Sequence, residues 1–197
     1  MIDCFAPRAG LFLDRDGVVN VDTGYVHHPD QIDFIPGIFD LCRTAVQLNL
    51  PIIIVTNQSG VALGLYSQAD FHGLMCWIHD QFANEGVGIA HVEHSPWYPP
   101  ALAEIAATDL NWTWVRDSWW RKPGAGMVRR AAMITGVDPA LSTMIGDRAG
   151  DVAAAREAGI GTVIQFEHEA PRATRHNADQ FCTQHEQVIE ILRQIYG

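Results

Sequence analysis

Two aspartates separated by one residue follow a short apolar run near the start of the chain. Asp14 and Asp16 come directly after Leu11-Phe12-Leu13, and Gly17 follows them. A buried strand normally carries no charge, so two carboxylates at its carboxyl end indicate a function. In open α/β sheets, ligands bind at that end of the strands. With Arg15 between the acids and a flexible glycine after them, the stretch predicts a site for a metal ion and a phosphate.

Three further polar clusters stand at the ends of apolar runs or just before helix-like segments. They are Thr56-Asn57-Gln58-Ser59-Gly60, Arg121-Lys122-Pro123 and Gly146-Asp147-Arg148-Ala149-Gly150-Asp151. In a parallel sheet the carboxyl ends of the strands share one edge, so residues that are distant in the sequence converge there. Lys122 is the only lysine in the chain, and every other basic residue is an arginine.

These residue types match what the hydrolysis of a phosphate ester requires. The uncatalysed reaction is so slow that enzymes accelerate it by up to roughly 10²¹-fold. A carboxylate nucleophile can form an aspartyl-phosphate, while a second acid with a raised pKa protonates the leaving oxygen and then activates water. Mg²⁺ with oxygen ligands offsets the negative charges, and hydroxyl, amide and lysine donors hold the phosphoryl group. The four clusters contain residues for each of these parts.

The segments between the clusters predict one α/β domain over residues 1–197. Apolar runs predict strands at 9–13, 51–56, 87–92, 142–146 and 161–166, and helical spacing predicts helices at 36–47, from Ser67 to about 82, from Pro123 and Gly124 to about 135, at 149–158 and at 185–196. Such alternation is typical of a doubly wound, mainly parallel, Rossmann-like sheet. An irregular insertion at about 94–121 holds five of the six tryptophans.

Composition limits the class of protein. The net charge of −10 argues against binding to nucleic acid or to an anionic membrane. No apolar run is long enough to span a bilayer, and no basic segment leads into an apolar one near Met1, so we expect a cytoplasmic protein. Four scattered cysteines without a close pair predict free thiols.

The four motifs, in this order, resemble those of the haloacid dehalogenase (HAD) superfamily. They are Asp14-x-Asp16-Gly17, Thr56-Asn57, Lys122-Pro123 and Gly146-Asp147-x-x-x-Asp151. Within the superfamily, Asp14-Arg-Asp-Gly-Val-Val-Asn20, Gly24-Tyr25-Val26-His27, Thr56-Asn-Gln-Ser-Gly60 and Arg121-Lys-Pro-Gly124 resemble the D-glycero-D-manno-heptose 1,7-bisphosphate phosphatases and their relatives, the histidinol-phosphate phosphatases. The resemblance covers about residues 8–168.

The resemblance implies a Mg²⁺-dependent phosphomonoesterase that acts through an aspartyl-phosphate. It implies Asp14 as nucleophile and metal ligand, and Asp16 as general acid/base with its backbone carbonyl on the metal. Asp147 would be the remaining protein ligand of the metal, and Asp151 would orient the metal's waters. The residues implied to bind the phosphoryl group are Thr56, Asn57 and Lys122, and those implied to contact the substrate are Arg121, Arg148 and His27. It further implies the HAD fold without a separate cap domain, an open mouth whose specificity comes from residues 20–30 and 94–120, and action as a monomer.

The implied substrate is a small phosphorylated sugar, namely heptose 1,7-bisphosphate losing its C7 phosphate, in nucleotide-heptose synthesis for lipopolysaccharide or capsule. Histidinol phosphate or another phosphomonoester is the alternative substrate, and a non-catalytic phospholigand-binding protein is the alternative from another class. The anomer and the pathway stay open at this point.

Several residues have a plainer interpretation. Asp14 and Asp16 could form a solvated turn, and Asp151 could simply complement the dipole of a helix N-terminus. Thr56 could merely end a strand, Lys122 could be a surface lysine, and His27 could be a solvated loop histidine. Ser59 lacks the surroundings of a nucleophilic serine, so it is interpreted as a helix start.

The sequence also departs from the resembled branch. Many of its members bind zinc in the insertion through one His and three Cys, whereas only His94 remains here and no cysteine lies between Cys76 and Cys182. One ligand does not hold Zn²⁺, so we predict no structural zinc. The tryptophans of the insertion then either replace the zinc by apolar packing or form an aromatic wall for a sugar. Leu63 stands where relatives often have a basic residue, which weakens the grip on a second phosphate.

Overall fold

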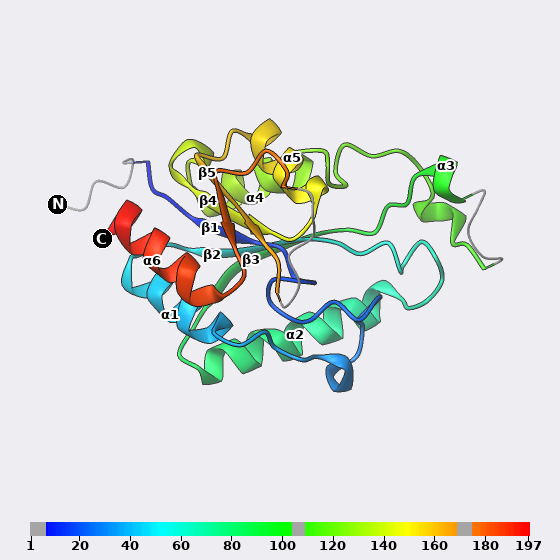
Figure 1. The fold of residues 1–197 in the computed structure, drawn as a ribbon. Helices are drawn as coiled ribbons and strands as arrows, with labels where there is room; N and C mark the ends of the chain where they lie inside the picture. The colour runs from blue at the N-terminus through cyan, green and yellow to red at the C-terminus, as the bar shows by residue number, and fades with distance from the viewer. Residues whose placement is uncertain (1–6, 104–108, 169–174) are drawn as a thin grey trace.

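The computed structural model describes residues 7–103, 109–168 and 175–197, and a parallel sheet forms its centre (Figure 1). The strand order is β3-β2-β1-β4-β5-β6, and each neighbouring pair is parallel. The strands are β1 (Leu11–Leu13), β2 (Ile52–Asn57), β3 (Ile89–Ser95), β4 (Thr143–Gly146), β5 (Thr162–Phe166) and β6 (Gln180–Cys182). The chain starts in the middle of the sheet, builds outward to β3 and then returns to the other side of β1, which is the doubly wound α/β fold that the sequence predicts.

Helices cover both faces of this sheet. They are α1 (Ile38–Gln47), α2 (Gln68–Asn84), α3 (Pro100–Ala103), α4 (Gly126–Thr135), α5 (Ala149–Ala158) and α6 (His185–Tyr196), with short 3₁₀ helices at Pro29–Gln31, Trp112–Trp114 and Pro139–Leu141. In Figure 1, α1, α2 and α6 lie on one side of the strands, and α4 and α5 lie on the other. None of the described helices has the length and apolarity needed to cross a bilayer.

The core has two layers because strand residues alternate between the faces of the sheet. Leu11 and Leu13 of β1 belong to the apolar cluster on the face that α1, α2 and α6 cover. Phe12, between them, belongs to the apolar cluster on the face that α4 and α5 cover. All three side chains are fully buried. A strand that is buried on both faces reads as a continuous apolar run, which is why the sequence predicts β1 and β2 so directly.

The structure corrects three expectations. The sequence gives no sign of β6, because this edge strand of three residues has only one buried residue, Cys182. The helix expected from Pro123 begins at Gly126, since residues 121–124 form a turn in which Gly124 N donates to Arg121 O at 2.8 Å. The insertion is also less irregular than expected, because β3 extends through Ser95.

The start of α2 is as the sequence predicts. The Ser67 hydroxyl accepts a hydrogen bond from Asp70 N at 3.1 Å, and the Asp70 carboxylate accepts one from Ser67 N at 2.8 Å. These bonds from Ser67 to the ionised carboxylate lower the pKa of Asp70. The pair is a capping box, which satisfies amide donors that the first turn of a helix otherwise leaves unpaired.

We expect Ser67→Ala to destabilise the protein by about 1 kcal/mol, because the variant loses the hydroxyl that caps α2. In a protein of this size, that loss lowers the melting temperature by roughly 2–4 °C. Urea unfolding measures the difference. Asp80→Ala, at an exposed site within the same helix, is the control and should change the free energy of unfolding by less than about 0.5 kcal/mol. Equal losses in both variants would contradict the capping role.

Candidate active site

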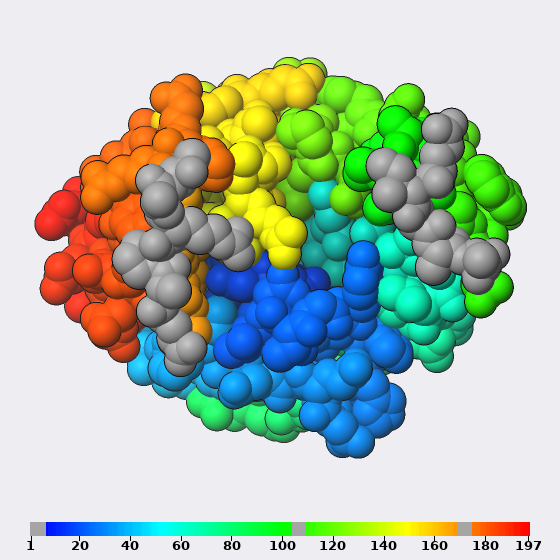
Figure 2. Space-filling model, turned by 45° about the vertical axis from the view of Figure 1, so that its right-hand side comes forward, coloured from blue at the N-terminus to red at the C-terminus, as the bar shows by residue number. Residues whose placement is uncertain are grey.

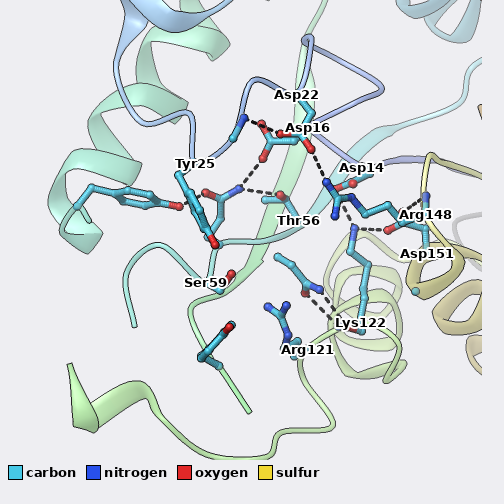
Figure 3. Close-up of a pocket in the computed structure, with 16 residues that line it drawn as sticks. Asp14, Asp16, Asp22, Tyr25, Thr56, Ser59, Arg121, Lys122, Arg148 and Asp151 are labelled. Atoms are coloured by element: carbon cyan, nitrogen blue, oxygen red, sulfur yellow. Dashed lines mark hydrogen bonds and ion pairs between the residues drawn. The ribbon is translucent and has the colours of Figure 1, made fainter. Parts of the chain in front are cut away.

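A cavity of about 460 Å³ opens at the carboxyl edge of the sheet. Its walls come from five parts of the chain: the segments after β1, β2 and β3, the turn before α4 and the start of α5. In Figure 2 the blue segment near the N-terminus, the yellow segment near residue 150 and cyan-to-green segments meet around a hollow. Figure 3 shows that Asp14, Thr56, Lys122 and Asp151 approach one another there. The four polar clusters therefore converge, as the parallel topology requires.

Three buried carboxylates lie together at the base of this cavity. Oxygen atoms of Asp14, Asp147 and Asp151 all lie within 4.8 Å of one another. Asp14 follows β1 and Asp147 follows β4, and these strands are neighbours in the sheet, with Leu13 opposite Ile145. The arrangement offers hard oxygen donors from two strand ends and one helix start, which is the ligand chemistry that Mg²⁺ prefers.

Lys122 is the cation beside this triad. Its Nζ lies 2.8 Å from Asp14 Oδ1 and 2.5 Å from Asp151 Oδ1, and it donates to Val55 O at 2.9 Å. The lysine is 5% exposed, so it is not an ordinary surface residue. Burial alone would lower the pKa of Lys122, but the two carboxylates raise it. The ammonium therefore stays charged beside two carboxylates, while Arg148 Nε lies 3.6 Å from the third, Asp147, so the three carboxylates outnumber these two cations.

The protonation of Asp14 reflects these buried charges. Burial, together with the charges of Asp151 and Asp147, raises the pKa of Asp14 to about 8 against the opposing charge of Lys122. An ordinary aspartate titrates near ~3.9. A divalent cation in contact with the three carboxylates would offset the excess charge and keep Asp14 ionised. The donor set therefore fits a divalent metal ion.

Two glycines make room for the triad. A Cβ at Gly17, whose φ is +89°, would lie 2.6 Å from Asp147 Cγ. A Cβ at Gly146 would lie 2.2 Å from Asp151 Cβ. Any side chain at either position would push a carboxylate out of place, which gives a physical reason for glycine in both motifs.

Asp16 stands apart from the triad but lines the same cavity. The buried Arg15 holds its carboxylate through Nε at 3.0 Å and Nη2 at 2.6–2.7 Å, and Asn20 Nδ2 donates to it at 3.1 Å. The sequence suggested that Arg15 contacts a ligand, whereas here its guanidinium is turned inward to Asp16 and to Val26 O. These hydrogen bonds thus fix the position of the Asp16 side chain on the cavity wall.

Thr56 and Asn57 follow one another at the end of β2 and have different contacts. Both line the cavity, but the Asn57 amide pairs with the backbone of Lys122, donating to its O at 3.0 Å and accepting from its N at 3.1 Å. Asn57 therefore anchors the turn that carries Lys122. The Thr56 hydroxyl accepts a hydrogen bond from Gln58 Nε2 at 2.9 Å.

The outer part of the cavity carries two arginines. Arg121 Nη1 donates to Trp97 O at 3.2 Å, and burial lowers the pKa of this arginine. Arg148 forms an ion pair with Asp22 across the mouth, and its Nε lies 3.6 Å from Asp147 Oδ2. Both guanidinium groups therefore belong to the cavity, and Asp22 is a lining residue that the sequence did not single out.

Like Asp147 of the buried triad, His27 is an expected site residue that lies outside the cavity lining. Its Nδ1 contacts Tyr25 O at 2.8 Å, and its ring stacks on Tyr66 with the centroids 4.9 Å apart. Tyr66 does line the cavity, so His27 touches the site through that ring. Ser59 lines the cavity too, but it lies in a turn, and the helix that we expected from it begins only at Gln68.

The aromatic rings on the cavity wall are tyrosines. Tyr25, Tyr66 and Tyr98 line it, whereas Trp97 and Trp114 pack against each other at 4.8 Å on a neighbouring groove. The hypothesis of a tryptophan wall for a sugar is therefore wrong for this cavity. Residues 20–30 and 94–120 still supply the rim, as expected, because Asp22, Tyr25 and Tyr98 come from them.

His94, the one remaining position of the zinc set, lies in an apolar contact. Its ring centroid is 4.4 Å from that of Phe71 and 5.4 Å from that of His72. Burial lowers the pKa of His94 to about 4. The absence of zinc stays a prediction from the sequence.

Comparison with known proteins places the chain among phosphatases. A family model described as HAD-hydrolase-like matches residues 119–180. The D-glycero-β-D-manno-heptose-1,7-bisphosphate 7-phosphatase of Yersinia pestis is 38% identical over 155 residues, which cover 78% of this chain and 78% of that protein. The D-glycero-α-D-manno-heptose-1,7-bisphosphate 7-phosphatase of Burkholderia mallei is 37% identical over 155 residues, covering 78% and 77%.

Solved structures give the same result. A putative HAD-like phosphatase from Mesorhizobium loti matches with a TM-score of 0.79 and 26% identity, over 98% of this chain and 90% of that one. The D,D-heptose 1,7-bisphosphate phosphatase of B. bronchiseptica, complexed with magnesium and phosphate, matches with a TM-score of 0.72 and 28% identity, over 94% and 98%.

We expect Asp14→Asn to stabilise the metal-free protein at pH 8, because it removes one charge from the buried triad. The folded-state pKa of Asp14, about 8, lies above the unfolded value of ~3.9. Protonation of Asp14 therefore stabilises the fold fully below the unfolded value, and this stabilisation is lost as the pH rises through about 8. Asparagine imitates the protonated form at every pH.

Melting temperatures in EDTA measure this effect. The variant should melt at least about 3 °C above the wild type at pH 8, a gain of roughly 1 kcal/mol or more, and this difference should become smaller as the pH is lowered to 5. Asp40→Asn, at an exposed site on α1, is the matched control and should show no such pH dependence. A variant that melts below the wild type at pH 8 would contradict the charge excess.

Proposed function

The chain belongs to the D-glycero-D-manno-heptose 1,7-bisphosphate phosphatase family of the HAD superfamily, and from that premise we propose that it removes the C7 phosphate of this sugar with the help of Mg²⁺. One observation carries the chemical part of the proposal. Three buried carboxylates cluster beside an open cavity, a buried lysine contacts two of them, and the negative charge there suits a divalent cation and a bound phosphate.

Asp14 is the nucleophile in this proposal. Its Oδ attacks phosphorus, and the bond from phosphorus to the sugar oxygen breaks, which leaves an aspartyl-phosphate. Asp14 and Asp147 would hold Mg²⁺ together with the backbone carbonyl of Asp16. When bound, Mg²⁺ supplies positive charge that offsets the charges of Asp14 and the phosphate. Asp151, which we expected to orient the metal's waters, also holds Lys122 Nζ at 2.5 Å, so it positions the lysine as well.

Asp16 is the proposed general acid and base. It gives a proton to the leaving sugar oxygen and then takes one from the water that hydrolyses the aspartyl-phosphate. Its place on the cavity wall, beside Asp14 in sequence and separate from the triad, supports this division of work. Two carboxylates in different surroundings can thus act as nucleophile and as acid.

Lys122 and Thr56 are the proposed donors to the phosphoryl oxygens, because both are buried polar groups on the wall of the cavity. Asn57 contributes by fixing the backbone of Lys122. The outer arginines, Arg121 and Arg148, suit the second phosphate of a bisphosphate, since both are further cations that line the cavity. The His27 ring supports the site from behind Tyr66.

We expect hydrolysis of D-glycero-D-manno-heptose 1,7-bisphosphate with a kcat/KM at least about 10-fold above that for histidinol phosphate, because a second anion contacting the two arginines contributes about 1.4 kcal/mol or more. Phosphate release with Mg²⁺ measures both values, and EDTA should abolish both. Assaying the α and β anomers in parallel identifies the one that is used. A preference for histidinol phosphate would overturn the substrate, and no turnover of any phosphomonoester would favour a binding protein.

We expect Asp14→Asn to lower kcat by roughly 10⁴-fold or more on the same substrate, since the amide cannot form the aspartyl-phosphate. The variant should keep its fold, as measured by circular dichroism. Asp40→Asn again serves as the control and should keep the wild-type rate. Near-normal activity of Asp14→Asn would contradict the aspartyl-phosphate mechanism.

A further inference from the structure

Gln58 lies between two groups of the proposed mechanism. Its side chain is 2% exposed, and its Nε2 donates to Asp16 Oδ2 at 3.1 Å and to Thr56 Oγ1 at 2.9 Å. One amide group therefore links the proposed acid to the proposed phosphoryl donor. Neither the chemistry of phosphate transfer nor the metal site needs a glutamine here, so its contacts call for a separate explanation.

The chemistry of these groups fixes the direction of each hydrogen bond. Asp16 Oδ2 accepts a hydrogen bond from Nε2, so the NH₂ group of Gln58 faces Asp16. The second hydrogen of the same NH₂ group points at the Thr56 hydroxyl, which accepts it. A hydroxyl has a single proton, so the proton of Thr56 stays available as a donor toward the cavity that the residue lines. Gln58 thereby orients a donor at the place where the phosphoryl group would bind.

Tyr66 holds Gln58 from the other end. Its hydroxyl donates to Gln58 Oε1 at 2.6 Å, which satisfies the amide oxygen and keeps the amide from rotating. The tyrosine ring is fixed in turn, because it stacks on His27 and packs so closely on Gly60 that a Cβ there would lie 2.1 Å from Tyr66 Cε1. A short chain of contacts thus runs from the rim of the cavity to Asp16.

We propose that Gln58, held by Tyr66, is a positioning residue that keeps the carboxylate of Asp16 in place for proton transfer and turns the hydroxyl proton of Thr56 toward the phosphoryl group. The inference rests on the proposed function and adds to it a link between the acid and the phosphate donor. Arg15 also holds Asp16, through both carboxylate oxygens, but it does not make this link to Thr56.

The test uses two substrates that differ in their need for a proton. The sugar oxygen of the heptose bisphosphate is a poor leaving group and needs a general acid, which contributes roughly 10²–10⁴-fold. Dinitrophenolate, from 2,4-dinitrophenyl phosphate, leaves without a proton. A displaced acid therefore slows the first substrate much more than the second, whereas a general loss of structure slows both alike.

The two variants remove single links. Gln58→Met keeps the length of the side chain without its hydrogen bonds, and Tyr66→Phe keeps the ring that stacks on His27. Tyr196→Phe is the matched control, because the Tyr196 hydroxyl also makes two hydrogen bonds, to Thr143 Oγ1 and Leu141 O at 2.8 Å each, away from the cavity. The kcat/KM values of all variants and of the wild type are measured at one pH and one Mg²⁺ concentration, after thermal melting has shown which variants fold.

We expect Gln58→Met to lower kcat/KM by about 10²-fold for the heptose bisphosphate and by less than about 10-fold for 2,4-dinitrophenyl phosphate. Tyr66→Phe should show the same bias with a smaller loss, and the double variant should be no worse than Gln58→Met, because Tyr66 acts through Gln58. Tyr196→Phe should match the wild type on both substrates.

Equal losses on the two substrates, or no loss on the sugar phosphate, would overturn the positioning role while leaving the proposed function intact. Additive losses in the double variant would overturn the part assigned to Tyr66. If Gln58→Met does not fold, Tyr66→Phe tests the positioning role instead. A larger loss on the heptose bisphosphate than on 2,4-dinitrophenyl phosphate supports that role, and equal losses overturn it. An inactive wild-type enzyme would overturn both the proposed function and this inference.

Discussion

The structure depends on one electrostatic constraint: three buried carboxylates lie close together, and one buried ammonium contacts two of them. Asp14, Asp147 and Asp151 lie too close together and too deep for water to screen their charges, and Lys122 offsets only part of them. Burying unbalanced charge costs free energy, so the protein keeps this arrangement only because the site uses it. The excess negative charge suits a divalent cation, and Lys122 lies where it could donate hydrogen bonds to a bound phosphate.

The rest of the fold maintains that geometry. Parallel strands β1 and β4 bring the two strand-end aspartates together, and the start of α5 adds the third. Gly17 and Gly146 provide the space, because a Cβ at either would collide with a carboxylate. The partly buried Asn57 amide holds the turn that carries Lys122. Rigid elements thus hold the acids, while the residues that line the mouth come from loops, a common division in α/β enzymes.

Sequence patterns predicted most of this because the central strands are buried on both faces and read as apolar runs that end in the polar motifs. They did not predict β6 or the contacts of Gln58, Tyr66 and Asp22, because a side-chain hydrogen bond between distant residues leaves no periodic signal. His27 was placed in the site by its motif alone, yet it reaches the cavity only through Tyr66. The monomeric state, the cytoplasmic location and the lack of zinc stay predictions.

The most direct measurement of the central claim is a crystal structure with Mg²⁺ and beryllium fluoride, which imitates a phosphoryl group on a carboxylate. We expect the beryllium to be bonded to Asp14, with Mg²⁺ held by Asp14 and Asp147 and with Lys122 and Thr56 donating to the fluorides. A beryllium bonded to another residue, or a Mg²⁺ ion that does not touch both aspartates, would contradict the account.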